Sequence, residues 1–211
     1  MKMYYLHKRK LIPILIIIFG IYFISCNSLK NKYSYKMEIS NITQPKNFDI
    51  ESYTSNSGTG NVYEFVREDG TKVKQSSFPG GYAEIETPLV PAFYKIEKLY
   101  YQNGKIQEFG AALGFMKIGV WKYYDENGKE TVVDEDEKYG KPNYNDVLAF
   151  LDKKGYINLH TGENRERVSV GYDPKARMWG AVVFNFKGKN HIYDFDRKGK
   201  VISYKTIIPT E

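Results

Sequence analysis

The feature that most constrains the fold is a glycine turn that recurs between strand-like segments. Residues 100–105 contain Tyr-Tyr-Gln-Asn-Gly-Lys, residues 123–129 contain Tyr-Tyr-Asp-Glu-Asn-Gly-Lys, and residues 68–71 contain Glu-Asp-Gly-Thr. Asn-Gly or Asp-Gly between strand-like runs indicates a β-hairpin, because the type I′ turn requires positive φ. We therefore expect antiparallel hairpins that turn at Gly70, Gly104 and Gly128.

The N-terminus has the parts of an export signal. Residues 1–10 carry four basic residues and no acidic one, and residues 11–25 form an apolar run. This run is shorter than the ~20 residues that a membrane-spanning helix requires, and it suits the apolar part of a signal peptide. We expect residues 1–25 to be removed; the alternative is an uncleaved membrane anchor.

The apolar run ends in Phe23-Ile24-Ser25-Cys26, which resembles the lipobox of bacterial lipoproteins. Ser25 fits the small position before the cleavage site, and Phe23 departs from the usual leucine. The resemblance implies that Cys26, the single cysteine of the chain, carries the lipid, palmitate included, and becomes the mature N-terminus. Asn27 stands where an aspartate would imply inner-membrane retention, so we expect the outer membrane. Residues 27–32 lack the acidic cluster that resembles a surface-export signal, so we expect the protein to face the periplasm.

The segment after the cysteine is polar and has scattered apolar residues, so we expect residues 26–50 to be a tether. Residues 55–61, rich in Ser, Gly and Asn, are expected to form a loop. They match neither spacing of a phosphate-binding glycine loop.

A longer pattern surrounds two of the glycine turns. Gly119, Trp121, Tyr124, Gly128 and Lys129 are spaced as G-x-W-x-x-Y-x-x-x-G-K. This resembles the MORN-type repeat, in the bacterial form of the YwqK-like antitoxins. The resemblance covers residues 98–133 and implies a β-hairpin repeat domain, which we place at residues 51–135. An exported lipoprotein is a poor setting for a cytosolic antitoxin, so we do not expect that role.

An acidic stretch followed by Gly140 and Pro142 predicts a solvated linker over residues 136–142. A calcium-binding EF-hand loop is disfavoured, because the required Gly and Glu positions are not matched.

The remaining segment, residues 143–211, predicts one helix followed by strands. Tyr144, Val147, Leu148 and Leu151 share one helical face, which indicates a helix over residues 144–154. Strands are expected at 168–172, 178–186, 191–196 and 201–208. We expect the segment to fold on its own, with a core that includes Val147, Leu148, Leu151, Val182, Phe184 and Ile192.

This segment also resembles a PepSY-like domain. The resemblance rests on Trp179–Val183 and on Tyr193-Asp194 followed by Gly199–Ile202, and it covers residues 143–203. Asp196-Arg197-Lys198-Gly199-Lys200 departs from the family pattern, which has Thr before the Gly-Lys. The resemblance implies periplasmic binding or inhibition. The expected fold class is α+β, mostly β: antiparallel hairpin repeats followed by a small helix-plus-antiparallel-sheet domain.

The charge of the chain argues against a nucleic-acid partner. The full chain has 31 basic and 25 acidic residues, a net charge of +6. Without the signal, 27 basic and 25 acidic residues remain, a net charge of +2. Nucleic-acid binding requires a concentrated basic face, and these charges are mixed along the sequence.

No motif in the sequence predicts catalysis. His160 and His191 lack zinc-site spacing, and no G-x-S-x-G nucleophile motif occurs. Asp194 and Asp196 are expected on a solvated strand face. We therefore expect no catalytic residue, no metal and no cofactor.

Aromatic residues of the repeat are the candidate binding residues: Tyr101, Trp121, Tyr123 and Tyr124. Their rings suit contact with a sugar or peptide, and the alternative is that Trp121 and one tyrosine form the repeat core.

The expected function is a lipid-anchored cell-envelope protein that acts as a non-enzymatic binding module for a protein, peptide or glycan. The alternatives are an envelope enzyme or enzyme inhibitor, or a structural component of the envelope.

Overall fold

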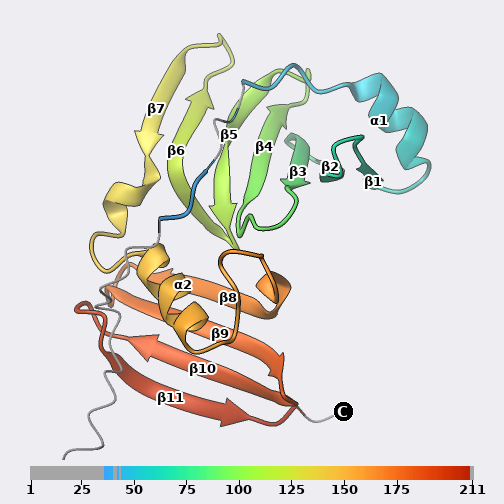
Figure 1. Ribbon diagram of the computed structural model, residues 1–211. Helices are drawn as coiled ribbons and strands as arrows, with labels where there is room; N and C mark the ends of the chain where they lie inside the picture. The colour runs from blue at the N-terminus through green and yellow to red at the C-terminus, as the bar shows by residue number, and fades with distance from the viewer. Residues whose placement is uncertain (1–35, 40–41, 43, 210–211) are drawn as a thin grey trace, which may run out of the picture.

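The computed structural model of the protein describes residues 36–39, 42 and 44–209, which form two antiparallel sheets (Figure 1). The expected signal and Cys26 lie outside the described residues. The seven strands of the first sheet pair in sequence order, and the second sheet has the order β11-β10-β9-β8. The strands are β1 (Val62–Val66), β2 (Lys72–Phe78), β3 (Gly81–Thr87), β4 (Lys95–Tyr101), β5 (Ile106–Leu113), β6 (Met116–Tyr124), β7 (Glu130–Asp134), β8 (Val168–Asp173), β9 (Met178–Phe186), β10 (Lys189–Phe195) and β11 (Val201–Ile207). This confirms the expected fold class.

The predicted hairpins turn at the predicted glycines, but the turn type differs. In the first hairpin the Gly70 amide donates to the Arg67 carbonyl and the Arg67 amide donates to the Thr71 carbonyl. Gly70 has φ 82°, whereas its neighbour Asp69 is not left-handed. This is a three-residue loop that ends in a left-handed residue, and not the two-residue type I′ turn. The same pattern recurs at Gly104, Gly128 and Gly199.

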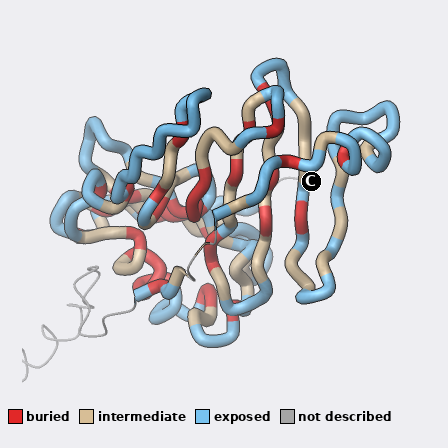
Figure 2. Tube along the Cα trace, turned by 90° about the horizontal axis from the view of Figure 1, so that it is seen from above, coloured by how far each residue is buried: buried red, intermediate tan, exposed pale blue. Residues whose placement is uncertain are grey.

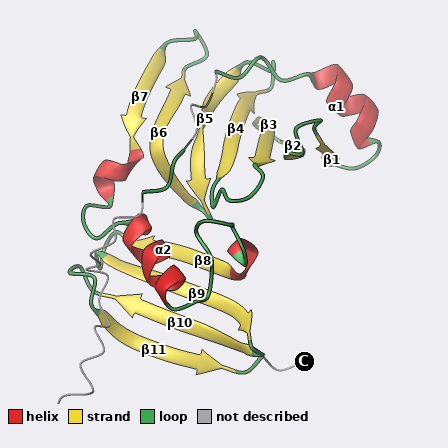
Figure 3. Cartoon of the chain, in the orientation of Figure 1, coloured by secondary structure: helices red, strands yellow, loops and turns green. Residues whose placement is uncertain are grey.

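The helix α2 (Tyr144–Lys153) forms as predicted, with Asn143 and Asp146 making the reciprocal hydrogen bonds of a capping box. It packs on one face of the second sheet (Figure 3). The predicted strand core lies on the wrong face: Val182 and Ile192 are half-buried, and Phe184 is 44% exposed. The helix instead covers Ala181, Val183, Tyr193 and Phe195. Strand alternation decides this, since a one-residue error inverts the face.

Two described residues of the segment predicted as a tether, Met37 and Phe48, are buried against the rest of the protein. The Met37 amide donates to Asn145 Oδ1, and the Met37 side chain is buried. The Phe48 amide donates to the Gly104 carbonyl. The helix α1 (Ile50–Ser57) was not predicted and replaces the first part of the expected loop at 55–61. Asp49 caps it, and Tyr53 joins Phe48 and Tyr100 in a small aromatic cluster.

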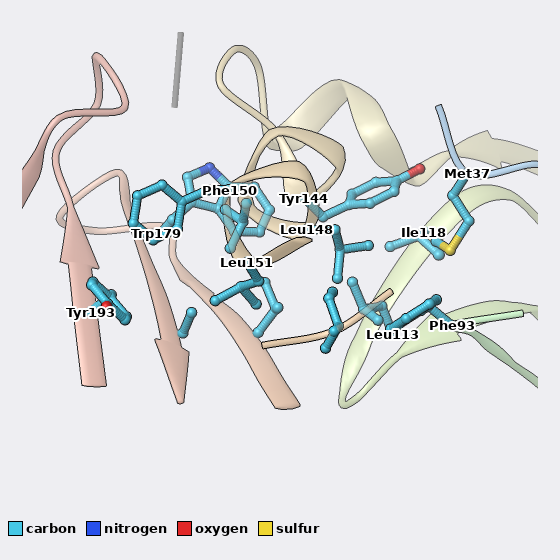
Figure 4. Packing of buried hydrophobic residues seen from close by; sticks show 14 of the residues in the cluster. Met37, Phe93, Leu113, Ile118, Tyr144, Leu148, Phe150, Leu151, Trp179 and Tyr193 are labelled. Atoms are coloured by element: carbon cyan, nitrogen blue, oxygen red, sulfur yellow. The ribbon is translucent and has the colours of Figure 1, made fainter. Parts of the chain in front are cut away.

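The two sheets share one hydrophobic core. Val147, Leu148 and Leu151 of α2 have no exposed surface and lie in one cluster with Leu113 of β5 and Ile118 of β6 (Figure 4). Figure 2 shows buried positions in the strands of both sheets and exposed positions at the outer turns. The boundary expected at residues 136–142 therefore separates the strands of the two sheets but not their core.

Buried charged side chains of β3 and β4 pair with one another on one face of the first sheet. Glu84 and Glu86 point to the same face of β3, because side chains alternate along a strand. Lys98 of β4 donates to Glu84 Oε1 at 2.9 Å and also binds Glu86. Arg67 Nη2 lies 2.6 Å from Glu86 Oε1, and Gln75 donates to Glu84. Burial alone would raise the pKa of Glu86, but the hydrogen bonds from Arg67 and Lys98 outweigh burial and lower it.

Replacing Lys98 by methionine tests this network. Its side chain is 11% exposed, and the change leaves two buried carboxylates short of a cation, so we expect a loss of about 3–5 kcal/mol in the free energy of unfolding. Lys74→Met is the matched control, since Lys74 pairs with Glu64 at 3.0 Å on the surface and should cost about 0–1 kcal/mol. Urea unfolding measures both; equal losses would contradict a structural role for the network.

Candidate functional site

The predicted aromatic residues do not form one exposed platform. Trp121 is 1% exposed, and its indole Nε1 donates to the Ala111 carbonyl at 2.8 Å. The indole lies directly over Gly110, where a side-chain Cβ would overlap the ring. Tyr124 is also buried and stacks on Phe109. Trp121 and Tyr124 therefore belong to the core of the repeat, which is the alternative stated above.

Tyr101 and Tyr123 are half-buried, and both hydroxyls are engaged. The Tyr101 hydroxyl donates to the Tyr124 carbonyl at 2.8 Å. The Tyr123 hydroxyl binds Glu135, and burial together with this hydrogen bond raises the pKa of Tyr123. The predicted binding residues thus make internal contacts, and their role in binding a partner stays a prediction.

Tyr123 connects the first sheet to the short 3-10 helix Glu135–Lys138. Lys117 lies beside Tyr123, and its Nζ is 4.1 Å from the centre of the Trp121 ring and 2.7 Å from Glu108 Oε2. Burial would raise the pKa of Glu135, but hydrogen bonds from Lys138 and Tyr123 outweigh burial and lower it. Glu135 is therefore a buried carboxylate that holds the 3-10 helix against the sheet.

The expected solvated linker is exposed at Glu137, Lys138, Gly140 and Lys141 but is attached to the body at Asp136 and Tyr139. Asp136 accepts hydrogen bonds from the Gly119 amide at 2.8 Å and from the Tyr144 hydroxyl at 2.9 Å, so it joins β6 to α2. Tyr139 is buried, and its hydroxyl donates to the Lys117 carbonyl. Of the four acidic residues in this stretch, Glu135 and Asp136 accept hydrogen bonds from other elements, whereas Asp134 and Glu137 are exposed.

This segment forms one wall of a pocket, which we call the junction pocket. Its cavity has a volume of about 320 Å³, which is at the lower end for ligand sites. The other walls are the β8–β9 turn and the β10–β11 turn. The lining residues are Glu137, Lys138, Tyr139, Gly140, Lys141, Pro142, Tyr172, Arg177, Trp179 and Arg197.

Three cations of the junction pocket have no carboxylate partner. Lys138 binds Glu135, but Lys141, Arg177 and Arg197 make no ion pair with any described residue. All three are exposed at the rim. Unpaired cations held together cost electrostatic energy, so an anion that enters the pocket is stabilised there.

Arg177 is also held in a strained backbone conformation. Its φ is 54°, in the left-handed region that glycine adopts without strain. For a non-glycine residue the cost is of order 1–3 kcal/mol. Asn164, Asn185 and Lys187 adopt the same left-handed φ in other turns, so the conformation identifies a turn position, and the case for a ligand rests on the charge and shape of the pocket.

A second cavity, of about 410 Å³, lies between the two sheets. Its arginine is engaged: Arg165 Nη1 donates to the Ala92 carbonyl at 2.7 Å, and Nε pairs with Glu166. The junction pocket is therefore the better candidate for an external ligand.

No group of three or more His, Cys, Asp or Glu residues in the described part of the chain is placed to hold a metal ion. His160 is exposed, and His191 Nδ1 contacts the hydroxyls of Tyr156 and Tyr204. Over the same part of the chain, no helix is long and apolar enough to cross a membrane.

Comparisons with protein-family models, curated proteins and solved structures find no significant match. A function for this protein is therefore proposed from the geometry of the site.

The sequence analysis did not find the junction pocket, because its residues come from three separate segments. Two signals were present: residues 136–142 are predicted as a boundary, and the strands predicted at 191–196 and 201–208 place a turn between them. Nothing in the sequence showed that these segments meet at Tyr172 and Arg177.

Replacing Tyr123 by phenylalanine tests the connection between the repeat and the pocket. The buried Glu135 carboxylate loses a donor, so we expect a loss of about 1–3 kcal/mol in the free energy of unfolding and faster amide exchange at residues 135–139. Tyr82→Phe is the control, since the Tyr82 hydroxyl has no hydrogen-bond partner among the described residues. Unchanged exchange at 135–139 in Tyr123→Phe would contradict the connection.

Proposed function

We propose that this protein is a lipid-anchored, non-enzymatic binding protein of the bacterial cell envelope, and that it binds its partner at the junction pocket. The observation that carries the proposal is the set of three unpaired cations, Lys141, Arg177 and Arg197, around an aromatic wall. Such an arrangement recognises a ligand through charge and ring contact and needs no chemical step.

The anchor in this proposal is Cys26, with the lipid in the outer membrane and the protein in the periplasm. The supporting evidence is the apolar run of residues 11–25 that ends at the lipobox-like Ser25-Cys26. Met37 is already bound to α2. Residues 26–36 span at most ~40 Å when fully extended, so the body of the protein stays close to the membrane surface.

We also propose that residues 98–133 are MORN-type repeats and that residues 143–203 are a PepSY-like domain. The first proposal is supported by the hairpins at Gly104 and Gly128, which have the same hydrogen-bond pattern. The second is supported by a capped helix followed by a four-stranded antiparallel sheet. The antitoxin activity of YwqK-like proteins forms no part of the proposal.

Replacing Cys26 by alanine tests the anchor. Without the thiol no diacylglycerol can be attached, so we expect palmitate labelling to be lost and the protein to leave the membrane fraction or stall in export. Labelling and fractionation of cells that carry either form measure this. Continued labelling of Cys26→Ala would contradict the lipoprotein assignment.

A photo-crosslinking residue placed at position 141 tests partner binding in intact cells. We expect position 141 to give a discrete crosslinked product, because Lys141 lines the junction pocket. The matched control is position 187, another exposed lysine, in the β9–β10 turn at the opposite end of the second sheet. Equal or absent products at the two positions would contradict a partner at the pocket.

A further inference from the structure

The charge inside the junction pocket selects the kind of ligand that it can hold. Lys138 is neutralised by Glu135, and of the remaining charged residues Lys141, Arg177 and Arg197 are positive and Glu137 is negative. The pocket therefore has a net charge of about +2 that the described protein does not compensate. A carboxylate would neutralise half of this charge, whereas a phosphate monoester carries about −1.5 to −2 at pH 7.

The side chains around the pocket suit a phosphate in geometry as well as in charge. Arginine presents a planar fork of donors that matches phosphate oxygens, and two of the three unpaired cations are arginines. They stand on different turns, Arg177 after β8 and Arg197 after β10, so that they approach the cavity from separate walls. The nearby acid Asp173 accepts hydrogen bonds from the amides of Lys175 and Ala176 in its own turn.

An aromatic wall adjoins these cations. Tyr172 is half-buried and lies edge-on to Tyr139, with ring centres 5.4 Å apart, and 4.8 Å from Trp179. Trp179 is itself fixed by a hydrogen bond to the Pro142 carbonyl at 2.9 Å. The Tyr172 ring is thus held rigidly, and its accessible part offers an apolar surface for a ring of the ligand.

From these observations we infer that the junction pocket binds a phosphate monoester carried on a ring, with the phosphate between Arg177, Arg197 and Lys141 and the ring against Tyr172. The inference rests on the proposed function and names the ligand of the same site. Two sources share this chemistry: a soluble sugar phosphate and the phosphorylated ring of a lipid headgroup. The membrane lies within reach, because residues 26–36 are too short to hold the body far from it.

Titration calorimetry of the mature chain, residues 26–211 without acyl chains, tests the inference. Ribose 5-phosphate is the probe, ribose is the uncharged counterpart, and inorganic phosphate is the counterpart without a ring. We expect ribose 5-phosphate to bind more tightly than either counterpart, with an affinity that falls as salt is raised. Vesicles of phosphatidylcholine with phosphatidylinositol 4-phosphate, compared with phosphatidylinositol, show whether a headgroup is an equally good source.

The decisive variant is Arg177→Gly. Glycine adopts the left-handed φ of this position without strain, so the variant keeps its fold while it loses one arginine fork. We expect its affinity for ribose 5-phosphate to fall about tenfold or more. Lys187→Gly is the matched control, because Lys187 is a cationic turn residue with φ 51° at the opposite end of the same sheet; its affinity should not change. Arg197→Gln should reproduce the loss.

Equal affinity of Arg177→Gly and Lys187→Gly would overturn the inference, as would equal binding of ribose and ribose 5-phosphate, or no binding of any phosphate probe. Crosslinking at position 141 separates these failures from failure of the proposed function. A crosslinked partner without phosphate binding overturns the ligand class alone, for instance in favour of an acidic protein segment. Loss of both results overturns the binding site itself.

Discussion

The fold depends on the apolar face of α2, which is buried by both sheets at once. Val147, Leu148 and Leu151 have no exposed surface, and their cluster reaches from Phe195 in the second sheet to Ile118 in the first. A helix of this length is marginal in water and owes its stability to packing. Neither sheet therefore has a complete core without the helix between them.

Polar contacts fix how the parts meet at this core. Asp136 receives hydrogen bonds from Gly119 and from Tyr144, so one carboxylate sets the distance between β6 and α2. Glu135 accepts hydrogen bonds from Tyr123 of β6 and from Lys138 of its own 3-10 helix, so it holds that helix against β6. Buried carboxylates must be hydrogen-bonded to be tolerated, which means that these contacts add specificity to an interface whose free energy is mainly hydrophobic. Both residues therefore also fix the position of the pocket wall that residues 137–142 form.

Local patterns in the sequence predicted local structure well. The glycine turns, the capped helix and the four strands of the second sheet follow from backbone conformation and short-range periodicity. The choice of buried face failed, because Val182, Phe184 and Ile192 alternate with Ala181, Val183 and Tyr193, and both sets are apolar. The residues before 50 were also judged by polarity alone, whereas single residues such as Met37 and Phe48 are enough to attach that segment to the body. The candidate site required tertiary contacts between three segments, so no local pattern could predict it.

The cations of the junction pocket lie outside the hydrophobic core, although two of its aromatic residues, Tyr139 and Trp179, belong to that core. These cations stand on two turns and on the segment before α2, while the strand ladders and the α2 core lie behind them. Loops tolerate substitution better than the elements they connect, so side chains at the rim can change without loss of hydrogen bonds in the sheets. Arg177 lowers the stability of its turn, because its left-handed backbone costs conformational free energy that a glycine would not. Lys187 carries the same cost in a turn far from the pocket, so the backbone conformation alone assigns no ligand to Arg177, and the proposal depends on the unpaired charges around the cavity.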